Sequence, residues 1–304
     1  MTVHRTYVRT KYSVRKFKKF AKKHPAAAAL FTLAVAALII FGLVSQHQAA
    51  PAEPRDGLYV HYIDVGQGDC ELIECNGEYM LIDSGYPEHG GDVVDYILDL
   101  GVDKIEYLVC SHGDADHCGG FEEVLRYIDV ETVFVSPYGS DSVFYSIFLD
   151  KLEDEKLEPT VPEMGESYDL GGAEIHFLGP TSDNGDTNEN SLILRLDYGK
   201  TSFLFTGDVE KLGEQDLLDS DADIKCDVLK VAHHGSYTST GYRFLYEADP
   251  DIAVISCGKD NSYGHPHEVV LSRLKDAEVT VYRTDIEGTV VIFSNGEKVS
   301  RTAA

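Results

Sequence analysis

Four potential metal ligands lie within six residues of one another, in a loop between a predicted strand and a predicted helix. The apolar segment 105–110 is typical of a buried strand, and residues 121–128 have helical apolar spacing. The connection includes SHGDADHCGG, whose side chains are of the types that bind Zn, Mn or Fe. A loop can turn several side chains towards one point, as a regular strand or helix cannot. We therefore predict a metal site, rather than a polar capping loop with incidental histidines, at His112, Asp114, Asp116 and His117.

Three later strand ends also carry polar groups. FTGD places Asp208 after an apolar strand, either as an isolated turn residue or as a carboxylate that bridges two ions. LKVAHHGS places His233 and His234 after another, and at least one of them is expected to be a ligand. YGHPH places His265 and His267 after a further strand, where either is a candidate proton donor or substrate contact.

Two earlier turns supply further aspartates. IDVGQGD contains Asp64 and Asp69, and LIDSG contains Asp83. We expect these carboxylates to orient ligand histidines, although a purely structural turn role is an equal alternative for Asp64. The glycine pattern in the first turn is too short for a dinucleotide fingerprint and no helix opens there, so a nucleotide cofactor is excluded.

The charged residues are unevenly distributed along the chain. Residues 1–24 contain nine basic and no acidic residues, and 26–45 contain no charged residue. A helix needs about 20 apolar residues to cross a bilayer, and flanking positive charge keeps its end in the cytoplasm. We therefore predict a single-pass signal anchor at 25–46 in the cell membrane, with the remainder extracellular. A signal peptide cleaved near Ala50 is the alternative.

The rest of the chain alternates strand and helix signals. Early strands are joined by glycine turns, whereas later strands alternate with helices such as 266–277, which has Pro266 in its first turn. This order indicates an α/β protein with two sheets and helices outside them. The expected organisation is a basic cytoplasmic tail at 1–24, the anchor at 25–46, a linker at 47–57 and one folded domain at 58–300.

Composition restricts the partners and the redox chemistry. The chain after residue 24 contains 17 basic and 52 acidic residues, so its surface is not expected to hold nucleic acid in a stable complex. Its six cysteines lack the spacing of a disulfide framework, and a domain of this size can form its own core. We therefore expect mostly free thiols.

The motifs together resemble those of metallo-β-lactamase-fold hydrolases, in particular the soluble hydrolase domain of ComEC-type competence proteins. The resemblance covers about residues 58–293. It implies a four-layer αββα sandwich with two divalent ions, Zn or Mn, at one edge of the sheets. It assigns His112 and Asp114 to the first metal position, Asp116 and His117 to the second, Asp208 to the bridge, and His234, with His233 as the alternative, to the late histidine.

The chain departs from the wider family at two positions. Asp114 stands where the family usually has a second histidine, as it does in the ComEC-like subgroup. A further family histidine is absent from 186–191, where Asn190 is the candidate replacement. Oxygen ligands make a site harder, so we expect Mn to compete seriously with Zn.

The expected reaction is hydrolysis by a metal-bound hydroxide. Two ions about 3.5–4 Å apart activate a shared water and stabilise developing negative charge, which suits phosphodiesters. The prediction is an extracellular membrane-anchored phosphodiesterase or nuclease, acting on DNA (which the resemblance suggests), nucleotides or cell-envelope polymers. The assigned roles are direct participation in catalysis for Asp116, leaving-group protonation for His265 or His233, and a phosphate contact for Ser236. Lactam, lactone or thioester hydrolysis is one alternative, and a non-catalytic envelope or partner-binding role with a decayed site is the other.

Overall fold

The structure, a computed structural model, describes Pro25 and residues 55–304. The predicted basic tail, the predicted anchor apart from Pro25, and most of the predicted linker lie outside the described residues. Within the described part of the chain, no helix has both the length and the apolar character needed to cross a membrane.

The first sheet has eight strands. In chain order they are β1 (Leu58–Tyr62), β2 (Glu71–Cys75), β3 (Glu78–Ile82), β4 (Lys104–Cys110), β5 (Asp129–Val135), β6 (Pro159–Thr160), β14 (Val290–Ser294) and β15 (Val299–Thr302). Their order across the sheet is β15-β14-β1-β2-β3-β4-β5-β6. The strands β1, β2 and β3 pair antiparallel, as expected of short strands joined by glycine turns, whereas β3 to β6 run parallel.

The second sheet has seven strands. They are β7 (Ser167–Leu170), β8 (Ala173–Gly179), β9 (Ile193–Tyr198), β10 (Thr201–Phe205), β11 (Val228–Lys230), β12 (Ile252–Ile255) and β13 (Thr280–Arg283), and their order is β13-β12-β11-β10-β9-β8-β7. The hairpin of β9 and β10 turns at Gly199 and Lys200, and β10 to β13 run parallel.

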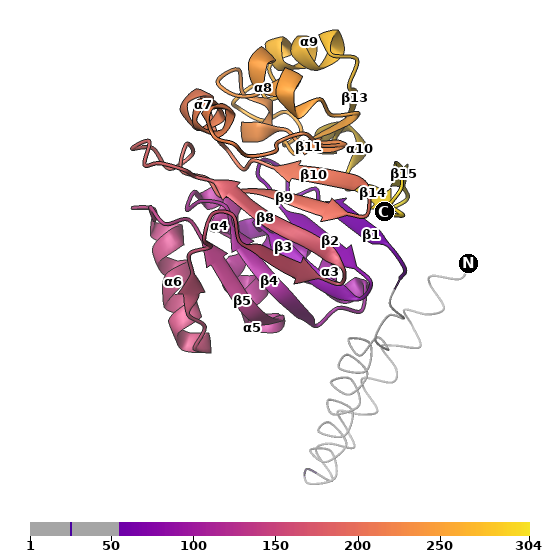
Figure 1. Cartoon of the computed structure of the whole chain (residues 1–304). Coiled ribbons are helices and arrows are strands. Elements are labelled where there is room, and N and C mark those ends of the chain that lie inside the picture. Colours follow the sequence, from indigo (N-terminus) through magenta and orange to yellow (C-terminus); the bar gives the residue numbers. More distant parts are fainter. Residues whose placement is uncertain (1–24, 26–54) are drawn as a thin grey trace, which may run out of the picture. The chain divides into compact units, whose positions relative to one another are not determined.

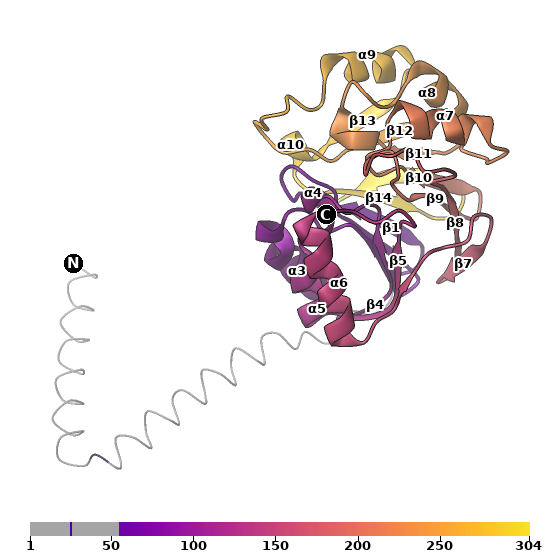
Figure 2. The same ribbon diagram turned by 90° about the vertical axis from the view of Figure 1, so that its left-hand side faces the viewer.

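Helices cover the outer faces of both sheets (Figures 1 and 2). On the first sheet these are α3 (Gly90–Asp99), α5 (Phe121–Tyr127) and α6 (Val143–Glu155), and on the second they are α7 (Lys211–Asp219), α8 (Tyr242–Ala248) and α9 (Glu268–Asp276). The short elements are the 3₁₀ helices η1 (Pro87–His89) and η2 (Ala232–Gly235) and the helices α4 (Ala115–Cys118) and α10 (Thr284–Glu287).

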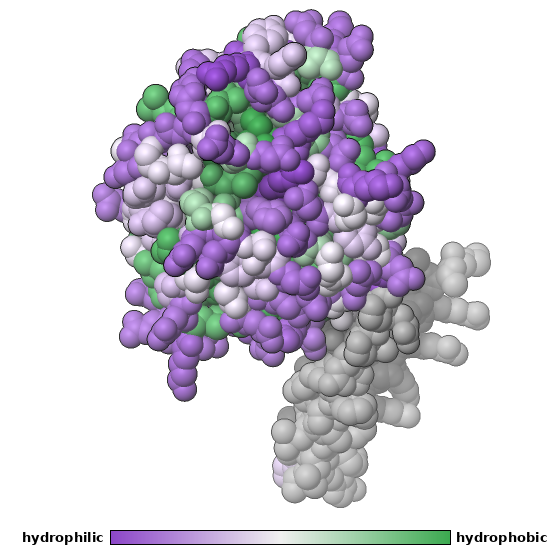
Figure 3. Space-filling view, in the orientation of Figure 1, coloured by the Kyte–Doolittle hydropathy of each residue, from purple (hydrophilic) through white to green (hydrophobic). Residues whose placement is uncertain are grey.

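Three apolar clusters hold these layers together. The cluster between the sheets contains aromatic residues of both, including Phe134 from β5 and Phe203 from β10. A second cluster lies under α3, α5 and α6, and a third lies under α7, α8 and α9. Burial of apolar surface between successive layers is the main contribution to the stability of the fold. The outer face of the molecule drawn in Figure 3 is mostly hydrophilic. The predicted αββα sandwich is therefore confirmed.

Some sequence-based boundaries are wrong. The predicted helix 266–277 begins at Glu268, so Pro266 precedes the N-cap residue His267 and is not in the first turn. Helix α8 was not predicted, and the mostly exposed β15 has only a weak strand pattern. All six cysteines are free and buried, as expected of thiols in a domain that forms its own core.

Parallel strands of both sheets place their carboxyl ends near one edge of the sandwich. The loop with His112 follows β4, Asp208 follows β10, and His234 lies in η2 after β11. Side chains that are far apart in sequence therefore become neighbours at this edge. Loops at such strand ends commonly form the binding sites of α/β proteins.

Candidate metal centre

The loop after β4 directs two histidines into the interior. His112 and His117 are buried, and their ring centroids lie 4.1 Å apart. Between them, Asp114 has extended backbone and occupies the N-cap position of α4. Gly113 is needed for packing, because a Cβ at this position would lie 2.3 Å from that of Ser140. The local backbone therefore fixes both imidazoles before any ligand binds.

Three buried imidazoles share one arrangement of their ring nitrogens. In each ring Nδ1 is close to a polar group of the protein: His117 Nδ1 to Asp83 Oδ2 at 2.8 Å, His234 Nδ1 to the Ser256 carbonyl oxygen at 3.0 Å, and His112 Nδ1 to Ser111 Oγ at 3.1 Å. The other nitrogen, Nε2, is buried without a hydrogen-bond partner in all three. Unpartnered buried polar atoms are costly, and a metal ion satisfies such nitrogens when the opposite nitrogen is held by the protein.

Asp208 and Asp116 complete one compact donor set with two of these rings. Asp208 Oδ2 lies 3.3 Å from His117 Nε2 and 3.5 Å from His234 Nε2, and Asp116 Oδ2 lies 3.4 Å from His234 Nε2. Tetrahedral ligands bound at about 2.0–2.1 Å are themselves roughly 3.3–3.4 Å apart. These four residues, which the resemblance implied for the second position, the bridge and the late histidine, therefore fit a divalent ion.

In the metal-free protein the same groups perturb one another's protonation. Burial opposes the charged form of His117, but the carboxylates of Asp208 and Asp83 raise its pKa well above the usual value. Burial is likewise outweighed at His234, where Asp208 and Asp69 raise the pKa to about 10. The pKa of Asp208 is held well below its usual range by the two imidazoles despite its burial. Metal binding must therefore release protons from these rings.

The first metal position has fewer closely placed donors. His112, His117 and Asp208 can each offer an atom to one ion, and burial lowers the pKa of His112 to about 3, which leaves it neutral. The Asp114 side chain is 44% exposed, and its Oδ2 lies 4.0 Å from His112 Nε2. Asp114 therefore lies at the rim of the cluster rather than within it.

The prediction that Asn190 replaces the absent histidine is not supported by the geometry. Its Oδ1 accepts a hydrogen bond from the Asn184 N–H at 2.9 Å, and its Nδ2 donates to Asp183 at 2.9 Å. The next residue, Ser191, reaches the cluster instead. Its Oγ lies 3.3 Å from His112 Nδ1 and accepts from the backbone N–H of Asp208 at 3.1 Å. The sequence offered no signal for Ser191 beyond its adjacency to the expected position.

Asp64 lies away from the ligand histidines, and this corrects the expectation that it orients one of them. It is exposed, and its Oδ1 accepts a hydrogen bond from the Gly66 N–H at 3.1 Å. The turn role, which was the alternative, is the one observed. Asp83, by contrast, contacts His117 directly, as expected of an orienting carboxylate.

Two other candidates are engaged in local structure. Ser236, predicted to hold a phosphate oxygen, is buried, and its Oγ lies 2.8 Å from Thr238 Oγ1. His267 accepts a hydrogen bond from the Tyr237 N–H at 3.1 Å and occupies the N-cap position of α9. Neither side chain reaches the donor set described above.

His233 and His265 lie beside the cluster. His233 Nδ1 lies 3.0 Å from Glu210 Oε1, and its Nε2 lies 3.7 Å from Asp208 Oδ2. Since His233 is partly exposed and His234 is buried among the other donors, the geometry favours His234 as the late ligand. The His265 ring is 5.6 Å from that of His233, and its Nδ1 is buried without a partner. Burial and neighbouring histidines lower the pKa of His265 to about 4.

A buried ionic network behind the cluster was largely missed. Lys230 donates to Asp69 Oδ2 at 2.6 Å, and Asp69 Oδ1 lies 3.1 Å from His234 Nδ1. The neighbouring Glu71 accepts a hydrogen bond from Ser256 Oγ at 3.3 Å, and burial and Asp69 raise its pKa well above the usual value. Asp69 was a predicted orienting residue. For Lys230 and Glu71, the available signal in the sequence was a charged residue within an apolar strand.

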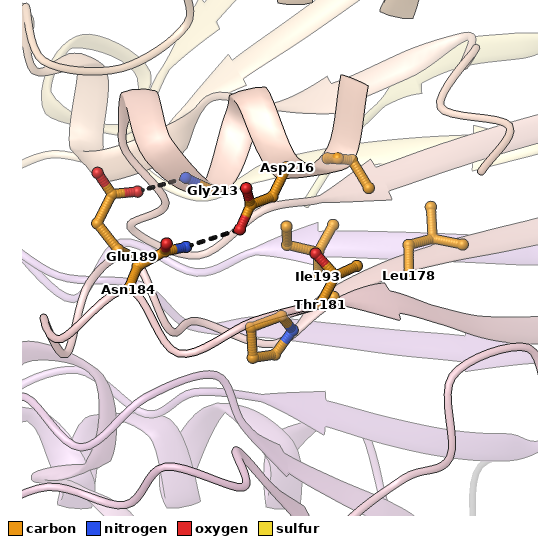
Figure 4. A pocket seen from close by; sticks show the side chains of 10 residues that line it. Leu178, Thr181, Asn184, Glu189, Ile193, Gly213 and Asp216 are labelled. Atoms are coloured by element: carbon orange, nitrogen blue, oxygen red, sulfur yellow. Dashed lines mark hydrogen bonds between the residues drawn. The ribbon is translucent and has the colours of Figure 1, made fainter. Parts of the chain in front are cut away.

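A pocket beside α7 contains none of the candidate ligands (Figure 4). Across it, Asn184 Nδ2 donates to Asp216 Oδ2 at 3.1 Å, and the Gly213 N–H donates to Glu189 Oε2 at 2.7 Å. Glu189 also accepts from two other backbone N–H groups at the start of α7. These contacts fasten the loop before β9 to α7, and so help to position Ser191.

Comparisons with known proteins agree with this geometry. The family profile described as the Metallo-beta-lactamase superfamily matches residues 63–259. ComE operon protein 3 of Bacillus subtilis is 32% identical over 259 residues, which covers 76% of this chain and 32% of that protein. Recombination protein 2 of Haemophilus influenzae is 34% identical over 241 residues, which covers 76% of this chain and 28% of that protein. Competence protein ComA of Neisseria gonorrhoeae is 31% identical over 258 residues, which covers 84% of this chain and 35% of that protein. The chain thus spans about a third of the length of these relatives.

Solved structures share the fold at low sequence identity. The metallo-beta-lactamase fold protein YhfI from Bacillus subtilis superposes with a TM-score of 0.52 at 13% identity, covering 79% of this chain and all of that one. The E377D mutant of CmlA beta-hydroxylase superposes with a TM-score of 0.53 at 14% identity, covering 80% and 55%. Identities this low support the common architecture alone.

Proposed function

Because the chain belongs to the metallo-beta-lactamase superfamily, we propose that it is a metal-dependent hydrolase whose substrates are phosphodiesters. The observation that carries the proposal is the convergence of buried, unpartnered Nε2 atoms of His112, His117 and His234 on Asp208. Neutral nitrogen donors combined with carboxylate oxygens suit divalent ions.

Divalent ions at this site would activate water and act as Lewis acids towards the substrate. The protein's contribution is to fix the direction of each ligand. Asp83 holds His117, and the Ser256 carbonyl holds His234, so both rings are oriented before the substrate binds. Asp116 takes part directly as a ligand between these two rings.

Two histidines at the edge of the cluster are assigned to proton transfer and substrate contact. Glu210 holds His233 Nδ1, which directs Nε2 towards Asp208, so we assign leaving-group protonation to His233 Nε2. His265, with a pKa lowered to about 4, is neutral near pH 7. We assign it a hydrogen bond to the substrate.

The donor set supports phosphoryl over acyl substrates. The carboxylates of Asp116 and Asp208 are among the donors, that of Asp114 lies at the rim, and the further histidine of the wider family is absent from 186–191. An oxygen-rich site favours hard ions such as Mn beside Zn, and hard ions favour phosphoryl oxygens. DNA, nucleotides and cell-envelope polymers are the candidate phosphodiesters.

We further propose that the hydrolase is extracellular and held at the cell membrane by the segment 25–46. The support is the uncharged stretch 26–45 and the nine basic residues that precede it. A fusion of the first 57 residues to a reporter enzyme that is active only outside the cytoplasm tests the orientation. An inactive reporter in a fusion that is present in the membrane would overturn it.

Phosphodiester chemistry is tested with the full chain, purified in detergent and stripped of metal. Hydrolysis of bis-(p-nitrophenyl) phosphate is measured with added Mn or Zn. We expect metal-dependent turnover in the wild type and in the control Asp150→Ala, an exposed site on α6, and loss of turnover in Asp208→Ala. Turnover of a lactam, lactone or thioester instead would replace the substrate class. Metal binding without any turnover would favour a partner-binding role.

A further inference from the structure

Lys230 has no role in the proposed reaction, yet it is buried directly behind the candidate metal centre. Its Nζ lies 2.6 Å from Asp69 Oδ2 and 3.2 Å from the carbonyl oxygen of Val231, and its side chain is 1% exposed. Burying an ion pair gives little net stability compared with apolar residues of the same volume. A buried lysine in the three-residue strand β11 therefore indicates a role other than stability.

Asp69, the partner of Lys230, has a free oxygen. Among the described residues, the buried carboxylate oxygens without a hydrogen-bond partner are Oδ1 of Asp69 and Oδ1 of Asp208. Asp208 is itself a candidate ligand, whereas Asp69 is not part of the donor set. Asp69 Oδ1 lies 3.1 Å from His234 Nδ1, but that nitrogen hydrogen-bonds to the Ser256 carbonyl oxygen at 3.0 Å.

The free oxygen is close enough to compete for the ion. A potential ligand atom from each of three residues, Asp69, Asp208 and His234, lies within 4.8 Å of the other two. The backbone of Asp69 is clamped to neighbouring loops, because its N–H donates to the Asp116 carbonyl oxygen at 3.1 Å and its carbonyl accepts from the Gly85 N–H at 2.9 Å. Because the backbone is held, only a rotation of the side chain would bring Oδ1 to an ion, which would attract it.

We propose that Lys230 is a positioning residue that keeps Asp69 out of the ligand shell of the metal. The ammonium group binds the second carboxylate oxygen and opposes the pull of the ion on the first. A catalytic metal site keeps an open position for water or substrate, whereas a site closed by protein ligands is structural. Lys230 thereby preserves the open position. The inference rests on the metal centre of the proposed function and not on the identity of the substrate.

The test replaces Lys230 by methionine, which has a similar length and no charge. The full chain in detergent is loaded with Co²⁺, whose visible absorption reports the number and type of its ligands. In Lys230→Met we expect the absorption band to shift and weaken as Asp69 enters the shell. The Co²⁺ dissociation constant should fall severalfold, because a carboxylate is gained and a nearby positive charge is lost. Hydrolysis of bis-(p-nitrophenyl) phosphate should fall at least tenfold, roughly the cost of disturbing an outer ligand partner.

Two further variants separate positioning from packing. Lys230→Met/Asp69→Asn replaces the carboxylate by an amide, a weaker ligand, and should return the spectrum towards that of the wild type. Arg195→Met removes a cation that bonds Asp197 at 2.9 Å and the Lys225 carbonyl oxygen at 2.6 Å, ahead of β11. This control should lose stability without changing the spectrum of bound Co²⁺.

The outcomes are distinct. An unchanged spectrum in Lys230→Met, weaker Co²⁺ binding, or a changed spectrum that persists in the double variant overturns the inference. If Lys230→Met does not fold, Lys230→Gln, which loses the charge but keeps a donor for Asp69, must show a smaller spectral change in the same direction, or the inference is wrong. Failure of the folded wild-type chain to bind Co²⁺, Mn or Zn would instead overturn the proposed metal centre itself.

Discussion

Replacing Asp83 by asparagine tests how the protein prepares His117 for metal binding. The Asp83 carboxylate lies 2.8 Å from His117 Nδ1 and accepts hydrogen bonds from Ser111 Oγ at 2.6 Å and the Ser111 N–H at 2.8 Å. Its backbone has φ 55°, a left-handed conformation that asparagine tolerates far better than alanine. Asp83→Asn therefore preserves the backbone and the side-chain shape, and changes only the charge and one acceptor.

The expected effect follows from the tautomer of His117. With Oδ2 replaced by an amide group that donates, His117 Nδ1 must become an acceptor, and the ring proton moves to Nε2. Because Nε2 is the atom that faces Asp208 at 3.3 Å, the favoured tautomer no longer offers a lone pair to the ion. Losing an orienting carboxylate of this kind costs about 10–100-fold in metal affinity or activity, which is about 1.4–2.7 kcal/mol.

Competition with a chromophoric chelator measures this affinity for Mn or Zn, and thermal unfolding of the metal-free protein checks the fold. Asp64→Asn is the matched control, because it makes the same change at an exposed turn aspartate that does not contact the ligand histidines. We expect its metal affinity to stay within a few-fold of the wild type. Wild-type affinity in Asp83→Asn would refute the argument that this carboxylate sets the tautomer of the ring.

Three other predictions concern metal, ligand identity and pH. Chelation should lower the unfolding temperature, because an ion present at 100 times its dissociation constant adds about 2.7 kcal/mol; an unchanged temperature by calorimetry contradicts a bound ion. Elemental analysis should find metal retained in His233→Ala and reduced in His234→Ala, and the reverse result would exchange their roles. Burial raises the pKa of Glu214 from 4.5 to about 7, so its contribution to stability is full below about pH 4.5 and is lost as pH rises through 7. Urea titrations of Glu214→Gln should therefore show less loss of stability between pH 5 and 8 than the wild type, and parallel losses would contradict this.

The sequence predicted those features that depend on local pattern. A loop with His112 and His117 directly after an apolar strand has few other interpretations, and Asp208 and His234 follow strands of the same kind. The order of hairpin strands followed by alternating strands and helices was sufficient for the two-sheet architecture. Asp83, which also follows a strand end, was expected beside a ligand histidine, and it lies 2.8 Å from His117 Nδ1.

The features that the sequence did not predict depend on which way a side chain turns. Asn190 and Ser191 are adjacent, so a shift of one residue in the loop decides which one faces His112. The direction in which each side chain points is set by the hydrogen bond of Asn190 to Asp183 and by the bond of Glu189 to the backbone of α7. Neither contact is visible in a local sequence pattern. Lys230 was overlooked for a related reason, since its partner lies 161 positions earlier in the chain.

Charge balance connects these observations. Asp69, Asp83 and Asp208 are buried around the imidazoles, and Lys230 is the buried lysine that faces Asp69 among the described residues. Without metal, the excess negative charge is offset by protons on His117 and His234, which is why their pKa values rise despite burial. Divalent ions replace those protons with larger charges, so the metal-free cluster already has the electrostatic potential that a metal requires. Two of these carboxylates lie outside the ligand set: Asp83 contacts His117 Nδ1, and Asp69 is the one that a lysine neutralises.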